Sequence, residues 1–103
     1  MNFSIVIPTW NRSELVDDLL YSLYEERKRY SSGETEVLIV DSSQGIEKNN
    51  IIESCQKYDA VYVEGDDSVR KKRNKGIRMS KYDTILFIDS DVTVEKGLLD
   101  EYE

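Results

Sequence analysis

The sequence predicts an α/β fold, an open parallel sheet with helices on both of its faces. Four short apolar runs, each rich in Ile, Val or Phe, are typical of buried strands. Between them, apolar residues recur at the three-to-four spacing of amphipathic helices. The order βαβαβαβ with short connections favours parallel pairing through right-handed crossovers. With 103 residues, the chain is expected to form a single domain over residues 1–103.

The first strand and helix lie at the start of the chain. Residues 3–7 form an apolar strand that we expect to end at Pro8, because proline cannot donate a ladder hydrogen bond. Asn11 is predicted to cap the helix that follows, and Glu14, three residues later, can complete a capping box. Leucines at helical spacing extend this helix to about Tyr30.

Two further strands and a helix come next. Residues 36–41 form a second buried strand, which ends in an aspartate, Asp41. A polar loop follows, and residues 46–58 carry apolar side chains at the spacing of a second helix. Residues 60–63 are a third, short strand.

The third helix is predicted over residues 69–79, with Asp67 or Ser68 as its cap. Gly76 lies in the middle of this helix, where glycine costs about 1 kcal/mol relative to alanine, so we expect close packing against the sheet. Residues 84–88 then form the fourth strand.

Two carboxylates, Asp89 and Asp91, follow the fourth strand directly, before a further helix predicted to begin over residues 94–102. In open α/β sheets, ligands bind at the carboxyl ends of the strands. Two acidic side chains there are suitable ligands for Mg²⁺ or Mn²⁺. The other strands also end in polar residues, namely Thr9 and Asn11, Asp41, and Glu64 to Asp67. The sequence therefore predicts a polar, carboxylate-rich crevice.

Composition excludes several classes of function. The net charge of −7 argues against a general nucleic-acid binder. The absence of histidine excludes a Ser-His-Asp triad and a histidine-built zinc site in this chain. The single cysteine, Cys55, cannot form an internal disulfide and favours a reduced, cytoplasmic setting. No apolar run is long enough to span a membrane, and the start lacks the basic region of a signal peptide.

The turn after the first strand, residues 8–12, contains no glycine. A dinucleotide fingerprint or a P-loop needs glycines there so that the backbone can approach phosphate. Phosphate would instead have to be held by a metal and by basic side chains. Six basic residues crowd the third helix, although a solvated charged surface is the simpler interpretation for most of them.

Four segments resemble, in order, the signatures of family 2 glycosyltransferases, which have the Rossmann-like GT-A fold. They are residues 4–12, 36–43, 73–77 and 85–91, and they span nearly the whole chain. The resemblance implies transfer of a sugar from a nucleotide-sugar donor, with a UDP-sugar as the first expectation and the acceptor unknown. It also implies that the sheet is incomplete relative to a full GT-A domain.

The resemblance implies roles for the residues of the first two segments. Pro8, Thr9 and Asn11 would line the nucleotide pocket, with the ring of Trp10 next to the base. Asp41 would accept a hydrogen bond from the base. Simpler interpretations stay open: a helix cap for Asn11, packing for Trp10 and a strand-end turn for Asp41.

The last two segments would hold the diphosphate. By resemblance, Arg73 would position or neutralise it, and Asp89 and Asp91 would bind ribose and Mn²⁺ or Mg²⁺. These two aspartates could also be simple turn residues. Three positions depart from the family pattern: Ser42 and Val92 stand where a further acid is frequent, and Lys72 stands where a small residue is common.

Two other functions compete with donor-dependent transfer. Residues 86–94 also resemble the first motif of haloacid-dehalogenase-type phosphatases, with Asp89 as nucleophile and Asp91 as general acid, although that motif normally lies on a first strand. A non-catalytic nucleotide-binding module is the second, because the general base of the resembled family would be expected beyond Glu103. On this interpretation the chain binds a donor without transferring sugar. An uncovered sheet edge is also expected to favour self-association.

Overall fold

The computed structural model describes residues 1–103 and contains one four-stranded parallel sheet. Its strands, in the spatial order β3-β2-β1-β4, are β1 (Phe3–Thr9), β2 (Thr35–Asp41), β3 (Val61–Glu64) and β4 (Thr84–Phe87). The helices are α1 (Ser13–Arg29), α2 (Gly45–Lys57), α3 (Val69–Met79) and a short 3₁₀ helix η1 (Leu99–Tyr102). The predicted α/β class, the parallel pairing and the order of elements are therefore confirmed.

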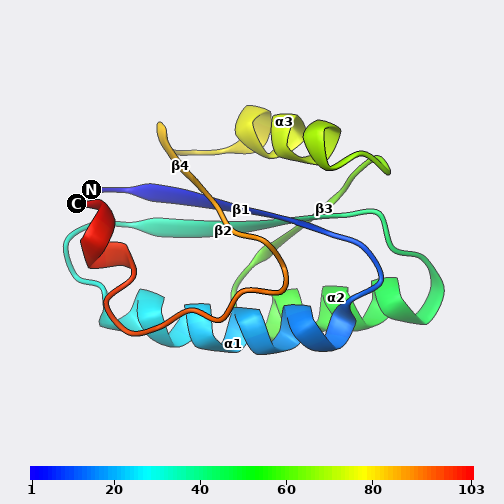
Figure 1. Ribbon diagram of the computed structural model, residues 1–103, viewed down its shortest axis with the longest axis horizontal. Helices are drawn as coiled ribbons and strands as arrows, with labels where there is room; N and C mark the ends of the chain where they lie inside the picture. Colours follow the sequence, from blue (N-terminus) through cyan, green and yellow to red (C-terminus); the bar gives the residue numbers. More distant parts are fainter.

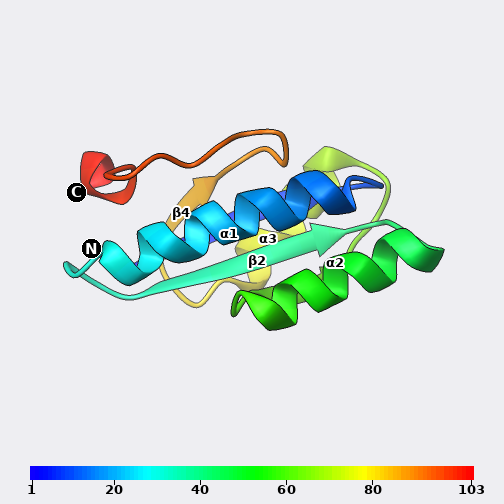
Figure 2. The same cartoon turned by 90° about the horizontal axis from the view of Figure 1, so that it is seen from below.

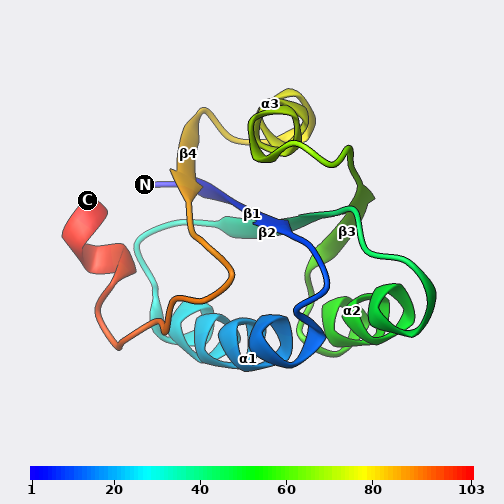
Figure 3. The same ribbon diagram turned by 45° about the vertical axis from the view of Figure 1, so that its right-hand side comes forward.

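The sheet lies between two helical layers. Helices α1 and α2 cover one face and α3 covers the other (Figure 1, Figure 3). Because side chains of a strand alternate between faces, Phe3, Ile5 and Ile7 of β1 join the larger core beneath α1 and α2. Val6 joins a smaller core on the side of α3. All seven residues of β1 are buried, as expected for a central strand of a doubly covered sheet.

Gly76 brings α3 close to β1, as predicted. A Cβ added at Gly76 would lie well inside contact distance of Val6 Cγ1 and 3.0 Å from its Cγ2. We expect Gly76→Ala to lower the free energy of unfolding by about 1–3 kcal/mol, because overpacking outweighs the better helix propensity of alanine. In a Val6→Ala background the same substitution is expected to be neutral or stabilising. Urea denaturation of the four variants measures this coupling, and equal costs in both backgrounds would contradict it.

Strand β1 continues through Pro8 to Thr9, so the predicted end at residue 7 is wrong. Pro8 pairs with Val40 of β2. The missing N–H of Pro8 breaks no ladder on the other side, because the pairing with β4 ends at Val6, whose carbonyl accepts the N–H of Ile88. The strand therefore carries Thr9 to the edge of the sheet beside Asp41.

The predicted capping box of α1 is also wrong. The helix begins at Ser13 after a cap residue, Arg12, that makes no side-chain capping bond. Asn11 has a φ of 50° and serves the turn instead. The N–H of Ser13 donates to Glu47 of α2 over 3.1 Å, so a neighbouring helix satisfies this end of α1. For α3, the predicted Ser68 cap is confirmed, because its hydroxyl accepts the N–H of Lys71.

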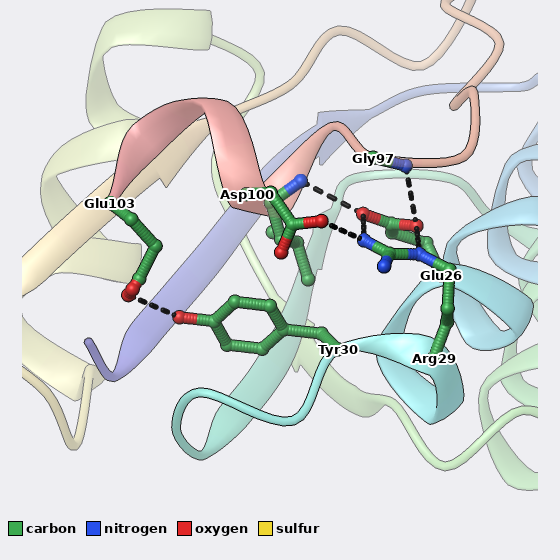
Figure 4. Close-up of polar contacts among 7 residues, drawn as sticks. Glu26, Arg29, Tyr30, Gly97, Asp100 and Glu103 are labelled. Carbon is green, nitrogen blue, oxygen red and sulfur yellow. Dashed lines mark hydrogen bonds and ion pairs between the residues drawn. The ribbon is translucent and has the colours of Figure 1, made fainter.

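The segment after β4 runs along α1 and ends in the 3₁₀ turn over residues 99–102 (Figure 1, Figure 2). The predicted helix over residues 94–102 is wrong apart from that turn. Gly97, at a φ of 96°, interrupts it. The N–H groups of Gly97 and Leu99 donate to the carboxylate of Glu26 rather than to preceding carbonyls (Figure 4).

Glu26 is the anchor of this segment. Its carboxylate is 3% exposed and accepts two bonds from Arg29, at 2.9 and 3.1 Å, besides the two backbone bonds. Arg29 also pairs with Asp100 at 2.7 Å (Figure 4). The bonds from Arg29, which outweigh the opposite effect of burial, and those from Gly97 and Leu99 lower the pKa of Glu26 from 4.5 to about 2.

Strand β4 forms one edge of the sheet and is only partly buried, with Phe87 41% exposed. The self-association expected at such an edge stays a prediction. None of the helices is both long and apolar enough to cross a membrane. Cys55 is free and buried, and burial raises the pKa of its thiol to about 12, which leaves it unreactive at neutral pH.

Candidate functional site

The carboxyl ends of β1 and β4 open into a hollow of about 350 Å³, which we call the β1–β4 hollow. Its lining consists of residues from the ends of these strands and the start of α3: Pro8, Thr9, Trp10, Arg12, Asp67, Val69, Lys72, Asp89, Ser90 and Asp91. Five of the predicted site residues therefore lie together here, while Asn11, Asp41 and Arg73 lie outside the lining. Trp10 is 60% exposed, so it is not held in the core by packing.

Asp41 lies beneath this edge and is 0% exposed. Its Oδ1 accepts the hydroxyls of Thr9 and Ser43, each over 2.7 Å, and its Oδ2 accepts that of Tyr62 over 2.7 Å. Burial and the bond to Asp41 raise the pKa of the Tyr62 phenol. The hydroxyl of Ser43 in turn accepts the N–H of Asn11 over 2.7 Å. This buried network ties the loop after β1 to the ends of β2 and β3.

Lys72 of α3 is 2% exposed and reaches the end of β1. Its ammonium donates to the carbonyl of Thr9 over 2.8 Å. Burial lowers the pKa of Lys72, and the charges of Asp41 and Asp67 oppose this shift. In the sequence, Lys72 is notable only because it departs from the family pattern. In the structure, Lys72 is a buried cation in the lining of the β1–β4 hollow.

Arg73, one residue further along α3, lies over the end of β4. Its guanidinium is 3.4 Å from Asp89 Oδ1 and 5.6 Å from the centre of the Phe87 ring. Its Nε has no acceptor although the atom is buried. Because the ion pair with Asp89 is loose, the outer nitrogens of Arg73 are able to bind an oxyanion.

Asp89 and Asp91 are exposed carboxylates in the lining of the β1–β4 hollow. The structure contains no group of three or more Asp, Glu, His or Cys side chains that could hold a metal ion. Mg²⁺ and Mn²⁺ accept one or two carboxylates when water and substrate phosphates complete their shell. The donor set of Asp89 and Asp91 fits such a shared site, although it does not form a complete protein cage.

A second hollow, of about 560 Å³, opens over the ends of β2 and β3. It is lined only by polar residues and glycines: Ser42, Ser43, Gln44, Gly45, Lys48, Glu64, Gly65, Asp66, Asp67 and Lys75. Lys48 pairs with the Glu64 carboxylate, and Lys75 donates to the Glu64 carbonyl. Asp67 lines both hollows, which makes them neighbours on one edge of the sheet.

Sequence reasoning missed two contributors to this edge, Tyr62 and Lys72. The burial of Lys72 has a sequence signal, because it lies four residues before Gly76 and therefore on the same helix face. The Tyr62 contact has none, because it depends on β3 pairing with β2 and on the register that places Tyr62 opposite Ile39, two residues before Asp41.

Known proteins resemble this chain over nearly its whole length. A family model described as glycosyl transferase family 2 matches residues 4–101. The chain is 31% identical to a chondroitin synthase of Pasteurella multocida, over 99% of this chain and 11% of that protein. The curated relatives are much longer, since the chain spans 10% to 39% of their length.

Solved structures share the fold. TarS of S. aureus superposes with a TM-score of 0.78 at 24% identity, over 99% of this chain and 31% of that one. A further structure of TarS, in complex with UDP-GlcNAc, gives 0.75. The mannosyltransferase PcManGT of Pyrobaculum calidifontis, in complex with GDP-Man and Mn²⁺, gives 0.75 at 19% identity, over 94% of this chain and 30% of that one. These likenesses establish the GT-A fold, and the family match establishes that the chain belongs to glycosyl transferase family 2.

Proposed function

We propose that this chain is the donor-binding part of a glycosyltransferase that takes a sugar from a nucleotide-sugar donor, with a UDP-sugar as the first candidate and a divalent metal as cofactor. The observation that carries the proposal is the meeting of Thr9, Trp10, Asp89 and Asp91 in one hollow at the carboxyl edge of the sheet. Relatives of the same fold that bind UDP-GlcNAc or GDP-Man with Mn²⁺ support it.

The proposed roles follow from the chemistry of each side chain. The exposed ring of Trp10 stacks on the base. Asp41 recognises the base through the hydroxyl network above it, since its own oxygens are already bonded. Arg73 donates to the diphosphate through its outer nitrogens, one of which lies 3.4 Å from Asp89 Oδ1. Pro8 and Asn11 shape the turn that holds Trp10.

Asp89 and Asp91 would hold Mn²⁺ or Mg²⁺, and Asp89 would also contact ribose. When bound, the metal stabilises the negative charge that develops on the departing nucleoside diphosphate. Arg73 lies 3.4 Å from Asp89, so a cation of the protein stands beside the same leaving group. Through the metal, Asp89 and Asp91 would orient the phosphates. Arg73 would neutralise part of the negative charge of the phosphates.

Isothermal titration with UDP, GDP and CDP, each with and without Mn²⁺, tests this function. We expect Mn²⁺ to strengthen UDP binding roughly 10-fold or more, and Asp91→Asn to remove that gain. Asp83→Asn is the matched control, because Asp83 is an exposed acid just before β4, at the opposite end of the strand. Equal binding by wild type and Asp91→Asn, with Mn²⁺ present, would refute the metal site.

We further propose that these 103 residues bind the donor without transferring its sugar, and that they work in the cytoplasm, where a buried free cysteine such as Cys55 stays reduced. No side chain assigned above deprotonates an acceptor. Metal-dependent release of UDP in the presence of an acceptor sugar, catalysed by this polypeptide alone, would contradict the first of these proposals.

A further inference from the structure

Lys72 is placed in an unusual way for a lysine. Its stem lies beneath Gly65, where an added Cβ would be 3.1 Å from Lys72 Cγ, and the residue is 2% exposed. Its ammonium donates to one protein acceptor, the carbonyl of Thr9. An ammonium has three N–H donors, so two of them have no protein acceptor.

The known contacts do not account for a charge at this position. The carbonyl of Thr9 also accepts the N–H of Ser42 over 3.3 Å, so it does not depend on Lys72. No carboxylate lies within 4.0 Å of the Lys72 nitrogen. Burying an unpaired cation costs free energy unless a counter-charge arrives. The β1–β4 hollow, which Lys72 lines, is where such a charge can enter.

Three basic side chains of α3 each contact the end of a different strand. Lys75 bonds the end of β3 at Glu64, Lys72 the end of β1 at Thr9, and Arg73 reaches Asp89 after β4. In the sheet order, β1 lies between β2, which carries Asp41, and β4. If the base lies toward Asp41 and the metal lies at Asp89, the group next to Lys72 is the link between nucleoside and metal-bound phosphate.

We propose that Lys72 binds the donor's α-phosphate, the phosphate attached to the nucleoside, and positions it between Trp10 and the metal carboxylates. The proposal rests on the proposed function and adds a residue to it. A phosphate offers only acceptors and negative charge, which match the two free donors and the charge of Lys72. Ribose hydroxyls and base edges would leave the charge uncompensated.

The test compares uridine, UMP and UDP as ligands of wild type and Lys72→Met by calorimetric titration without metal. Methionine keeps the unbranched stem and removes the ammonium. We expect Lys72→Met to weaken UMP and UDP roughly 10-fold or more and to change uridine binding less than about 2-fold. Lys71→Met is the matched control, because Lys71 is an exposed lysine of the same helix, and it should leave all three affinities nearly unchanged.

A second measurement needs no variant. In wild type carrying isotope-labelled lysine, the Cε–H resonance of Lys72 should shift on addition of UMP and not on addition of uridine. Equal weakening of uridine and UMP by Lys72→Met, or a resonance that UMP does not move, would overturn the assignment of Lys72 and leave the proposed function standing. Failure of wild type to bind any nucleotide, with or without Mn²⁺, would overturn both.

Discussion

Replacing Glu26 by alanine is expected to lower the free energy of unfolding by about 3–5 kcal/mol, because it removes one partner of a buried ion pair. Arg29 would keep only Asp100 as a partner, and the N–H groups of Gly97 and Leu99 would lose their acceptor. Urea denaturation at neutral pH measures the loss. Glu25→Ala is the matched control: Glu25 pairs only with Lys28 at the surface, so its removal should cost less than about 1 kcal/mol.

The same carboxylate gives the expected effect a pH dependence. The pKa of Glu26 is about 2 in the folded protein, below its ordinary value of 4.5, so folding favours the charged form. This stabilisation is complete above about pH 5 and is lost as the pH falls toward 2, a difference of about 3 kcal/mol. Glu26→Gln lacks a titrating group and should approach wild type in stability as the pH falls. A gap between the two proteins that stays constant from neutral pH to about pH 2 would contradict this account.

Asp41→Ala is expected to cost about 3–5 kcal/mol, because it leaves three hydroxyls without their acceptor. Asp41→Asn should cost less, about 1–3 kcal/mol, since an amide keeps one acceptor oxygen of the two. Chemical denaturation of both variants gives the values. Asp66→Asn, at an exposed aspartate of the same edge, serves as control and should be within about 0.5 kcal/mol of wild type.

A double-mutant cycle separates the Tyr62 bond from the rest of the network. Tyr62→Phe removes the donor to Asp41 Oδ2 and should cost about 1.5–3 kcal/mol in wild type. In the Asp41→Ala background the same change should cost almost nothing, because the phenol no longer has a carboxylate to bind. Additive costs would show that the Tyr62 hydroxyl contributes to stability independently of Asp41.

The fold was largely predictable because its signals are local and repeated. Each strand is a short apolar run, and the central position of β1 follows from a sequence that is apolar on both faces. Gly76 could be assigned a close approach because glycine in a helix interior needs a packing reason. Such features depend on neighbours in sequence and on the period of the element.

The failures share a different cause, which is that distant residues supply the bonds. Asn11 has the chemistry of a cap, but the first N–H of α1 is satisfied by Glu47 of another helix. The segment after Asp91 has apolar residues at helical spacing. Two of its N–H groups nevertheless donate to Glu26, which lies 71 and 73 residues away in the sequence. The hydroxyl network of Asp41 likewise depends on residues from β1, β3 and the loop after β2. Local patterns cannot reveal these partners, although the site residues at the strand ends could be named from topology.

Strands β1 and β4 are paired to different extents, and this difference affects how the proposed site responds to a ligand. β1 pairs with neighbours on both sides and is wholly buried, whereas β4 pairs over four residues on one side and stays partly exposed. Local opening therefore requires far less free energy at β4 than at β1. The nucleoside half of the site stands on the inner strand β1, and Asp89 and Asp91 stand beyond the edge strand β4. A donor that bridges both halves would hold β4 in place, so that part of its binding energy would be used to order the strand that carries the metal ligands.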